Sequence, residues 1–362
     1  MLRIADFSRV LAGPYATMLL ADFGAEVIKV ERPGGDDTRH WGPPYAADGQ
    51  ATYFAAVNRN KRSVVIDLAS EAGREEARRL IAASDVVVEN FAAGTMAKFG
   101  LDYATVSQQQ PELVYCSITG FGASGEGAAI PGYDLLVQAM GGLMSITGED
   151  AEHPTKAGVA LVDVITGLHA VIGIQQALLT RAESGEGQWV QVNLLSSLLS
   201  ALVNQGSAWV AGGVTPRAMG NAHPSIVPYE LFAAQDRAIV LAVGTDAQFA
   251  ALCEVLGKAE WASDERFATN PARVANREAL VPAIAAVLGQ RTAEAWLADL
   301  SRRRVPSGPV NTIAEAFALA ERLGLAPVAE VGGVATIANP IQFSKTPVTY
   351  RLAPPALPEE TR

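Results

Sequence analysis

Asp163 is the residue whose surroundings in this sequence most favour chemistry. It follows an apolar, strand-like run at residues 156–162 and begins a long helical pattern that continues to about Arg181. An aspartate in such a place is typical of a helix N-cap, because its side chain accepts hydrogen bonds from the free N–H groups of the first turn. Gly158 and Gly167 favour a nucleophile instead, since backbone without side chains lets a ligand approach closely. A carboxylate at a helix N-terminus is also expected to stay ionised, as a nucleophile must be, so both interpretations remain open.

Strands and helices alternate along the first half of the chain, and this alternation predicts how Asp163 is positioned. Apolar, β-branched runs predict strands, and periodic patterns predict the helices between them. The predicted strands cover residues 3–5, 25–30, 63–67, 85–89, 113–118 and 189–193, and the predicted helices cover residues 14–21, 71–83, 163–181 and 194–210. Such alternation is typical of an α/β protein with a mostly parallel sheet. Ligands are therefore expected in the loops beyond the carboxyl ends of the strands.

The character of the sequence changes after residue 210. Residues 211–228 contain many glycines and prolines and predict a linker. Two strands and three helices are predicted next, at residues 229–233, 238–242, 246–256, 276–288 and 292–303. We therefore expect a large α/β domain over residues 1–210 and a smaller α+β domain over residues 229–320. Residues 321–362, with strands at 328–337 and 341–343, are expected to return to the large domain.

Composition limits the classes of function. The 362 residues are 49% hydrophobic and 18% charged, as in a well-packed globular protein. A net charge of −10 argues against a nucleic-acid partner, so an anionic ligand must be bound by local arginines and lysines. The two distant cysteines, Cys116 and Cys253, and four scattered histidines give no spacing for a disulfide or a metal. Because no signal-peptide pattern and no run of about 18 apolar residues is present, a cytoplasmic protein without membrane association is expected.

Residues 120–125, Gly-Phe-Gly-Ala-Ser-Gly, match the G-x-G-x-x-G pattern of dinucleotide sites and follow a predicted strand. That pattern requires a helix directly after the loop, because the helix N-terminus binds the pyrophosphate. Gly127 and Pro131 follow here instead. We therefore expect a mobile loop and no nicotinamide or flavin cofactor.

Short motifs along essentially the whole chain are similar to those of the family III CoA-transferases, the family of formyl-CoA and carnitine-CoA transferases. The two longest matches are Phe-Gly-Ala-Glu-Val-Ile-Lys-Val-Glu-Arg-Pro-Gly at residues 23–34 and Asn-Arg-Asn-Lys-Arg-Ser at residues 58–63. The others are residues 6–8, 12–14, 37–39, 88–91, 120–122 and 132–134 and the segment around Asp163. The resemblance implies a large Rossmann-like parallel-sheet domain, a smaller α+β domain and an intertwined homodimer.

The resemblance also implies a reaction in which Asp163 is the nucleophile. In the family, the aspartate at this position attacks the donor thioester to give a mixed anhydride, and the CoA thiolate then returns to form an aspartyl-CoA thioester. The acceptor acid repeats the exchange. Dividing one difficult exchange into easier covalent steps suits a carboxylate, and backbone N–H groups of nearby glycines are expected to stabilise the oxyanions. Acyl-CoA and a carboxylic acid are thus the implied substrates, no permanently bound cofactor or metal is implied, and capping stays a compatible second role for Asp163.

The positions that the resemblance assigns to CoA follow predicted strands. Arg32 matches an arginine at the adenine and phosphate end, residues 66–69 border the adenine, and Lys98 stands where some members have arginine. A lysine meets phosphate as a point charge, without the bidentate fork of arginine. Without the resemblance, these cations are equally well explained as solvated surface charges. The full set is Val10, Leu11, Arg32, Ile66, Asp67, Leu68, Ala69, Asn90, Phe91, Lys98, Tyr133 and Asp134.

Tyr133 separates two reactions that similar enzymes perform. The 2-methylacyl-CoA racemases carry a Gly-His-Asp motif whose histidine moves the α-proton, whereas the triplet here is Gly132-Tyr133-Asp134. Tyrosine, with an ordinary pKa of about 10, is a poor base at neutral pH. Transfer is therefore expected, with a racemase or epimerase and a non-catalytic acyl-CoA binding protein as alternatives. His169, inside the apolar helix, is expected to be a packed histidine.

Leu11 bears on the acid that is accepted. Formyl-CoA:oxalate transferases carry a glutamine at the matching position, and they have a long glycine-rich loop where this chain has the short segment 206–224. Loss of that polar group makes a dicarboxylate as short as oxalate a less favoured acceptor. The motifs do not name the donor or the acceptor.

Overall fold

The computed structural model describes residues 1–46 and 48–358, and the chain divides into two compact units. The larger unit comprises residues 1–144 and 156–215 and the chain from Gly324 onward. The smaller unit comprises residues 145–155 and 216–323. The chain therefore leaves the larger unit twice and returns to it at Lys156 and Gly324.

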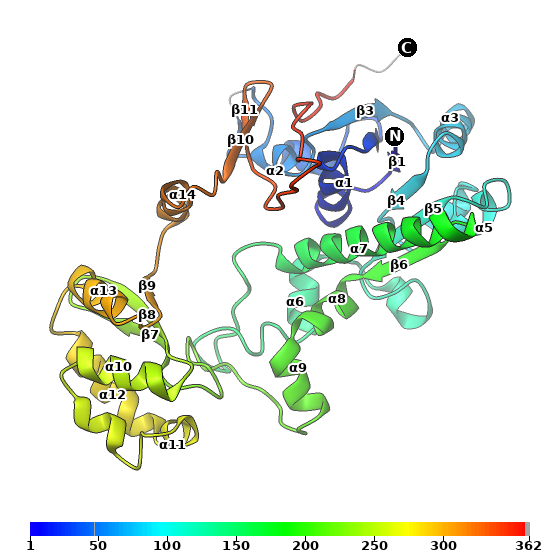
Figure 1. The fold of residues 1–362 in the computed structure, drawn as a ribbon. Helices are drawn as coiled ribbons and strands as arrows, with labels where there is room; N and C mark the ends of the chain where they lie inside the picture. Colours follow the sequence, from blue (N-terminus) through cyan, green and yellow to red (C-terminus); the bar gives the residue numbers. More distant parts are fainter. Residues whose placement is uncertain (47, 359–362) are drawn as a thin grey trace. The chain divides into compact units, whose positions relative to one another are not determined.

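The larger unit is built on a six-stranded sheet whose paired neighbours are all parallel (Figure 1). The strands are β1 (Arg3–Asp6), β2 (Glu26–Glu31), β3 (Lys61–Val65), β4 (Val86–Glu89), β5 (Val114–Thr119) and β6 (Trp189–Asn193), in the order β3-β2-β1-β4-β5-β6. This is the order of the doubly wound nucleotide-binding folds. It reverses between β1 and β4, where such sheets leave a crevice beyond the carboxyl ends of the strands. The α/β class and the parallel sheet predicted from the sequence are confirmed.

Helices cover both faces of this sheet. One face carries α1 (Ala12–Asp22), α6 (Asp134–Met140), α7 (Leu161–Ser184) and α8 (Leu194–Ala201), and the other carries α3 (Glu71–Ala82). Successive residues of a strand point to opposite faces. Accordingly, Ile4 of β1 packs in the cluster with α1 and α7, whereas Ala5 packs in the cluster with α3. The remaining short helices of this part are α2 (Thr52–Ala56), α4 (Thr95–Lys98), α5 (Tyr103–Val106) and the 3-10 helices at Asp37–His40 and Gly125–Ala129.

Gly167 lets α1 and α7 approach each other closely. A Cβ atom at this position would lie 2.7 Å from the carbonyl oxygen of Ala12 and 3.2 Å from the ring of Tyr15. Gly167 is buried between the two helices, so its lack of a side chain serves packing. The prediction that Gly167 opens the backbone to a ligand is therefore wrong, whereas Gly158 has open space where a Cβ would be.

Among the described residues, α7 is the one helix that is long and apolar enough to cross a membrane. No such segment is expected from the sequence, because Asp163 and His169 interrupt the apolar run. In this structure 39% of its most apolar window is buried, and the helix packs on α1, β5 and β6 as a core helix does. Other apolar residues of α7 face outward, notably Ile172 and Leu179, which are 62% and 64% exposed.

Several element boundaries differ from the predictions. The predicted helix at 194–210 is divided into α8 and α9 (Val203–Val210), and Val203 has a φ angle of 39° at the division. A β-branched residue is strained in that conformation, which periodicity cannot reveal. Residues 156–160 do not form the predicted strand, and neither do residues 341–343. The predicted strand at 328–337 is a hairpin of β10 (Val328–Val331) and β11 (Val334–Ile337), turned by two glycines with positive φ.

The smaller unit has its own antiparallel sheet and hydrophobic core. Its sheet has the order β7-β8-β9, formed by β7 (Tyr229–Ala233), β8 (Ala238–Ala242) and β9 (Ser307–Pro309). Its helices are α10 (Asp246–Val255), α11 (Asn270–Ala275), α12 (Arg277–Leu288), α13 (Ala293–Arg302) and α14 (Ile313–Arg322), with a 3-10 helix at Ala259–Ser263. The sequence did not predict β9, which contains Gly308 and Pro309, or α14, which buries no residue. Residues 145–155, which precede Asp163, also belong to this unit.

A buried ion pair fixes the C-terminal segment to the larger unit. The guanidinium of Arg59 donates to both oxygens of Asp22, at 3.1 and 2.6 Å, and to the carbonyl oxygen of Ile337 at 2.9 Å. Asn339 donates to Asp22 at 3.0 Å. Because the carboxylate is completely buried and its partners all donate to it, the charges compensate one another.

Candidate active site

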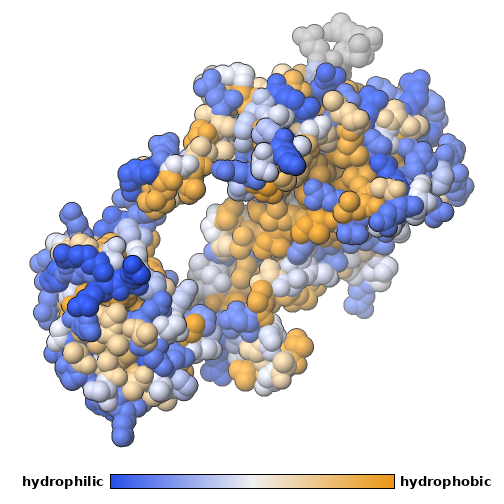
Figure 2. Space-filling model, viewed as in Figure 1, coloured by the Kyte–Doolittle hydropathy of each residue, from blue (hydrophilic) through white to orange (hydrophobic). Residues whose placement is uncertain are grey.

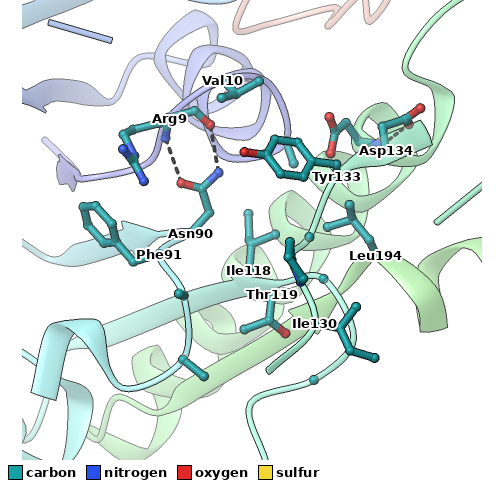
Figure 3. A pocket seen from close by; sticks show the side chains of 18 of the residues that line it. Arg9, Val10, Asn90, Phe91, Ile118, Thr119, Ile130, Tyr133, Asp134 and Leu194 are labelled. Atoms are coloured by element: carbon teal, nitrogen blue, oxygen red, sulfur yellow. Dashed lines mark hydrogen bonds between the residues drawn. The ribbon is translucent and has the colours of Figure 1, made fainter. Parts of the chain in front are cut away.

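A cavity of about 400 Å³ lies beyond the carboxyl ends of β1, β4 and β5, where the strand order reverses (Figure 3). The loops after these strands and the first residues of α6 and α8 contribute to its wall. It brings together part of the set assigned by resemblance: Val10, Leu11, Asn90, Phe91, Tyr133, Asp134 and Asp163. These residues come from four separate segments of the sequence, and the fold brings them together around one cavity.

Asp163 lies in the first turn of α7, and Ala160 occupies the N-cap position. The prediction that Asp163 is the N-cap is therefore wrong by one turn. The cap function is performed from another helix, because Oδ1 of Asp134 accepts the backbone N–H groups of Val162 and Asp163 at 2.8 and 3.1 Å. An acceptor remote in sequence leaves no local signal, which is why the sequence pattern pointed to Asp163 itself.

Burial and, as a smaller contribution, the negative charge of Asp134 together raise the pKa of Asp163 to about 7. The expectation that the helix N-terminus keeps this carboxylate fully ionised is therefore wrong. The free N–H groups that would stabilise the charge are already taken by Asp134. At neutral pH Asp163 is divided between a neutral acid and a carboxylate, and the carboxylate is poorly stabilised and correspondingly reactive.

The loop after β1 is held in a strained conformation at the cavity. Val10 has a φ angle of 67°, in the left-handed region that β-branched residues rarely adopt. Its N–H donates to Oδ2 of Asp36 at 3.2 Å. Lys29 donates to the same oxygen at 2.9 Å and to the carbonyl of Ser8 at 3.0 Å. Strain maintained by buried polar contacts next to a cavity is typical of a binding loop.

These contacts belong to a buried network of opposite charges beneath the loop. Lys61 donates to Asp6 at 3.1 Å, and both side chains are fully buried together with Lys29 and Asp36. Lys29 and other donors lower the pKa of Asp36 to about 2, against the effect of burial. The ion pairs of these ionised carboxylates therefore connect β1, β2 and β3 to the loop that lines the cavity.

Asn90 connects the loops after β1 and β4 across the switch point. Its side-chain oxygen accepts the N–H of Arg9, and its amide donates to the carbonyl of Arg9, both at 2.8 Å. The guanidinium carbon of Arg9 lies 5.0 Å from the ring centroid of Phe91. Figure 3 shows this group on one side of the cavity, with the ring of Tyr133 pointing toward Val10 on another.

Two glycines bring the loop with Tyr133 against the end of β5. A Cβ atom on Gly120 would lie 2.4 Å from the Cα of Gly132, so neither position tolerates a side chain. A 3-10 helix, Gly125–Ala129, follows the Gly-x-Gly-x-x-Gly segment. The α-helix that a dinucleotide site needs directly after this motif is therefore missing.

Residues 2–361 match the model of CoA-transferase family III. The chain belongs to CoA-transferase family III. It is 46% identical to a succinate–glutarate CoA-transferase of Agrobacterium fabrum, over 99% of this chain and 92% of that protein. It is 38% identical to the human succinyl-CoA:glutarate CoA-transferase, over 99% of this chain and 83% of that one.

The fold of the whole chain is also that of a family III member. The crystal structure of a CAIB/BAIF family protein from Brucella suis matches with a TM-score of 0.88 and 45% identity, covering 98% of this chain and 95% of that one. A crystal structure of Rv3272 from Mycobacterium tuberculosis also matches with a TM-score of 0.88, at 29% identity over 98% of this chain. The family that the motifs resemble is thereby confirmed.

Not all residues assigned to CoA by resemblance line the cavity. Ile66 is buried in the core with α3, and Asp67, Leu68 and Ala69 form the turn after β3. Lys98 is exposed at the end of α4. Arg32 pairs with Asp37, which does line the cavity. These positions follow β2, β3 and β4 and so share the carboxyl edge of the sheet with the cavity.

The structure adds residues that sequence reasoning missed. Arg9 lines the cavity, pairs weakly with Asp37 at 4.0 Å and is a cation that directly follows β1. Burial and the charges of Asp163, Asp134 and Asp36 together raise the pKa of Tyr53 to about 12. The Tyr53 phenol is therefore close enough to the two cavity carboxylates to respond to their charge. The position of Arg9 after a strand was a usable signal, whereas nothing near Tyr53 in the sequence connects it to Asp163.

His169 is a packed residue, as predicted: its Nδ1 lies 3.1 Å from the hydroxyl of Ser197 on α8. In the part of the chain that the structure describes, no group of three or more His, Cys, Asp or Glu side chains could hold a metal ion. The side chains that line the cavity include the carboxylates of Asp134 and Asp163, the phenol of Tyr133 and the guanidinium of Arg9.

Proposed function

We propose that this family III member transfers CoA from an acyl-CoA thioester to a free carboxylic acid and that Asp163 carries the covalent intermediates. The observation that supports this most is the position of Asp163 on the cavity wall at the switch point, with its pKa raised to about 7. A nucleophile must be accessible and poorly stabilised as an anion, and this carboxylate meets both conditions.

The reaction divides into four steps that leave Asp163 unchanged. The Asp163 carboxylate attacks the thioester carbonyl, the C–S bond breaks, and the CoA thiolate leaves a mixed anhydride. The thiolate attacks the aspartyl carbonyl, which releases the first acid and gives an aspartyl-CoA thioester. The acceptor carboxylate then attacks that thioester, releasing the thiolate and giving a second anhydride. Attack of the thiolate on the acceptor carbonyl yields the new acyl-CoA and restores Asp163.

The resemblance and the cavity together define the proposed CoA site. Val10, Leu11, Asn90 and Phe91 would bind the arm near the thioester, since they lie with Asp163 around one cavity. Arg32, residues 66–69 and Lys98 would serve the nucleotide end, because they lie beyond the ends of β2, β3 and β4. CoA enters as a substrate in this proposal, with no permanently bound cofactor.

For the acids, we propose dicarboxylates of the size of succinate and glutarate. Relatives at 46%, 40% and 38% identity are named for these acids, and they match 99% of this chain. A relative at 39% identity is named an acetyl-CoA:oxalate CoA-transferase, so the family includes shorter acceptors. Leu11 on the cavity wall is apolar and favours the longer acids.

Exchange assays test this proposal. The protein is mixed with succinyl-CoA and isotopically labelled glutarate, and labelled glutaryl-CoA is measured by mass spectrometry, with oxalate as a parallel acceptor. Asp163→Asn serves as the control for the nucleophile. Exchange by the wild type but not by this variant supports the proposal. Exchange of the α-proton of 2-methylacyl-CoA in deuterated water, without transfer to any acid, would instead indicate a racemase.

We further propose a homodimer, which the resemblance implies as an intertwined one. Figure 2 shows a broad apolar region over α7. Exposed apolar side chains on neighbouring helices include Leu199 (51%), Val203 (71%), Trp209 (60%) and Val210 (84%). Contiguous apolar surface of this kind is typical of an interface. Light scattering of the wild type and of Ile172→Glu tests the proposal, because a charge on this exposed apolar face of α7 should weaken the dimer, whereas a monomeric wild type contradicts the proposal.

A further inference from the structure

Gln138 is a buried amide one turn after Asp134 on α6, and it does not line the cavity. Only 1% of it is exposed, and both ends of its side chain are engaged. Its nitrogen donates to Oδ2 of Asp134 at 2.6 Å, and its oxygen accepts the N–H of Ala157 at 2.8 Å. Gln138 therefore joins α6 to the segment that leads into α7.

Asp134 continues this chain of contacts to the first turn of α7. Its Oδ1 accepts the N–H groups of Val162 and Asp163, while its Oδ2 is occupied by Gln138. Both carboxylate oxygens thus accept hydrogen bonds from donors within the protein. Rotation of the Asp134 side chain would break contacts on both sides, so its orientation is fixed by Gln138.

We propose that Gln138 is a positioning residue for the transfer reaction: it orients Asp134, and Asp134 holds the first turn of α7 with the Asp163 carboxylate facing the cavity. This inference rests on the proposed function of Asp163. A nucleophile must be held within a fraction of an ångström of the productive geometry. The Gln138 amide contributes to this by fixing the orientation of Asp134.

The same arrangement gives Asp134 an electrostatic effect on Asp163. The elements packed against α7 are α1, α6, α8, β5 and β6, and their titratable side chains are Tyr15, Asp22, Tyr115, Cys116 and Asp134. Of these, Asp134 alone contributes to the pKa of Asp163, and the charges of both carboxylates raise the pKa of Tyr53 on α2. Asp22 is compensated by Arg59, and His169, Arg181 and Glu183 lie further along α7 itself. Neutralising Asp134 therefore lowers the pKa of Asp163.

Two variants and a matched control test the inference with succinyl-CoA and glutarate as substrates. Gln138→Met keeps the volume but removes both hydrogen bonds, and we expect kcat to fall about tenfold or more while KM for the acyl-CoA stays within about twofold. Gln110→Met is the control, because Gln110 donates a single hydrogen bond to Ser84 beside the amino end of β5, away from the cavity. It should leave kcat and KM unchanged.

Asp134→Asn is the second variant. It keeps a side-chain oxygen for the α7 amides but removes the charge, so the acidic limb of the kcat profile should move to lower pH. If Asp134 acted only through its hydrogen bonds to α7, its replacement would change the plateau value of kcat but not the pH of the acidic limb. The acidic limb of Asp134→Asn still tests the contribution of Asp134 if Gln138→Met does not fold.

The outcomes separate this inference from the proposed function. Equal kcat for Gln138→Met and Gln110→Met overturns the positioning role, and an unmoved acidic limb for Asp134→Asn overturns the electrostatic effect of Asp134. In either case, exchange by the wild type but not by Asp163→Asn still upholds the function of Asp163. If the wild type forms no adduct on Asp163 with any acyl-CoA, the proposed function of Asp163 is wrong, whatever the kcat values of the variants.

Discussion

Oδ1 of Asp134 accepts the backbone N–H of Asp163 at 3.1 Å, so one carboxylate is fixed to the main chain of the residue that bears the other. The contact caps α7 from outside that helix, and it also brings a negative charge close to the candidate nucleophile. Structure and reactivity are therefore connected at this point, because the group that fixes Asp163 also makes its anion less stable.

The pH dependence of exchange should report the ionisation of Asp163. Burial and Asp134 raise the pKa of Asp163 to about 7. Only the carboxylate attacks a thioester, so kcat should approach its plateau above about pH 8 and fall about tenfold per pH unit well below about pH 7. The measurement is a kcat profile with succinyl-CoA and glutarate. A profile that is flat down to about pH 5 would mean that Asp163 is already ionised there, contrary to the raised pKa.

Because its pKa is raised, Asp163 lowers the free energy of unfolding at high pH. Below its ordinary value of 3.8 the group is protonated in both the folded and the unfolded chain. Above that value the unfolded chain ionises first, so the free energy of unfolding falls as the pH rises and levels off above about pH 7. Asp163→Asn should therefore exceed the wild type in stability at pH 8 by on the order of 2 kcal/mol, after discounting for partial exposure.

Denaturant unfolding at pH 8 and at pH 4.5 measures this difference. The advantage of Asp163→Asn should be large at pH 8 and small at pH 4.5. An advantage that is equal at both pH values would attribute the effect to packing and not to ionisation.

Replacement of Val10 by glycine should stabilise the protein, whereas the same replacement at an ordinary valine destabilises it. Its φ angle of 67° is unfavourable for a β-branched residue and easy for glycine. Val10→Gly should therefore increase the free energy of unfolding by about 1 kcal/mol. The matched control is Val214→Gly at a coil position whose own φ is not positive, and this variant should lose about 0.5 kcal/mol through backbone entropy. If both variants lose stability equally, the loop at Val10 holds no strain.

Arg59 should be far more important for stability than its neighbour Arg62. Arg59 pairs with fully buried Asp22 and contacts the carbonyl of Ile337, whereas Arg62 is 69% exposed and lies 3.4 Å from Glu26. Arg59→Met leaves a buried charge uncompensated and should cost about 3 to 5 kcal/mol. Arg62→Met should cost less than about 1 kcal/mol. Urea unfolding measures both, and a cost for Arg59→Met as small as that for Arg62→Met would show that this network does not fix the C-terminal segment.

The parallel sheet could be predicted from the sequence because its strands are short apolar runs, several of them next to clear helical patterns. The place of the cavity, beyond the carboxyl ends of the strands, followed from that sheet, whereas its lining residues could be assigned only through the resemblance, since Val10, Asn90 and Asp163 carry no shared local pattern. The cap of α7 could not be predicted, because Asp134 and Asp163 are remote in sequence and only the close contact of Gly120 with Gly132 brings the Tyr133 loop to the end of β5. Likewise, the raised pKa of Asp163 depends on burial and on Asp134, and neither follows from a helix N-terminus.

The central claim is that Asp163 becomes acylated during transfer. The protein is mixed with succinyl-CoA, quenched with hydroxylamine and digested, and the peptide containing residues 156–173 is examined by mass spectrometry. We predict a hydroxamate on Asp163 that depends on succinyl-CoA and is missing in Asp163→Asn, with Asp134 unmodified. An unmodified Asp163 in a preparation that exchanges CoA between succinate and glutarate would contradict the account.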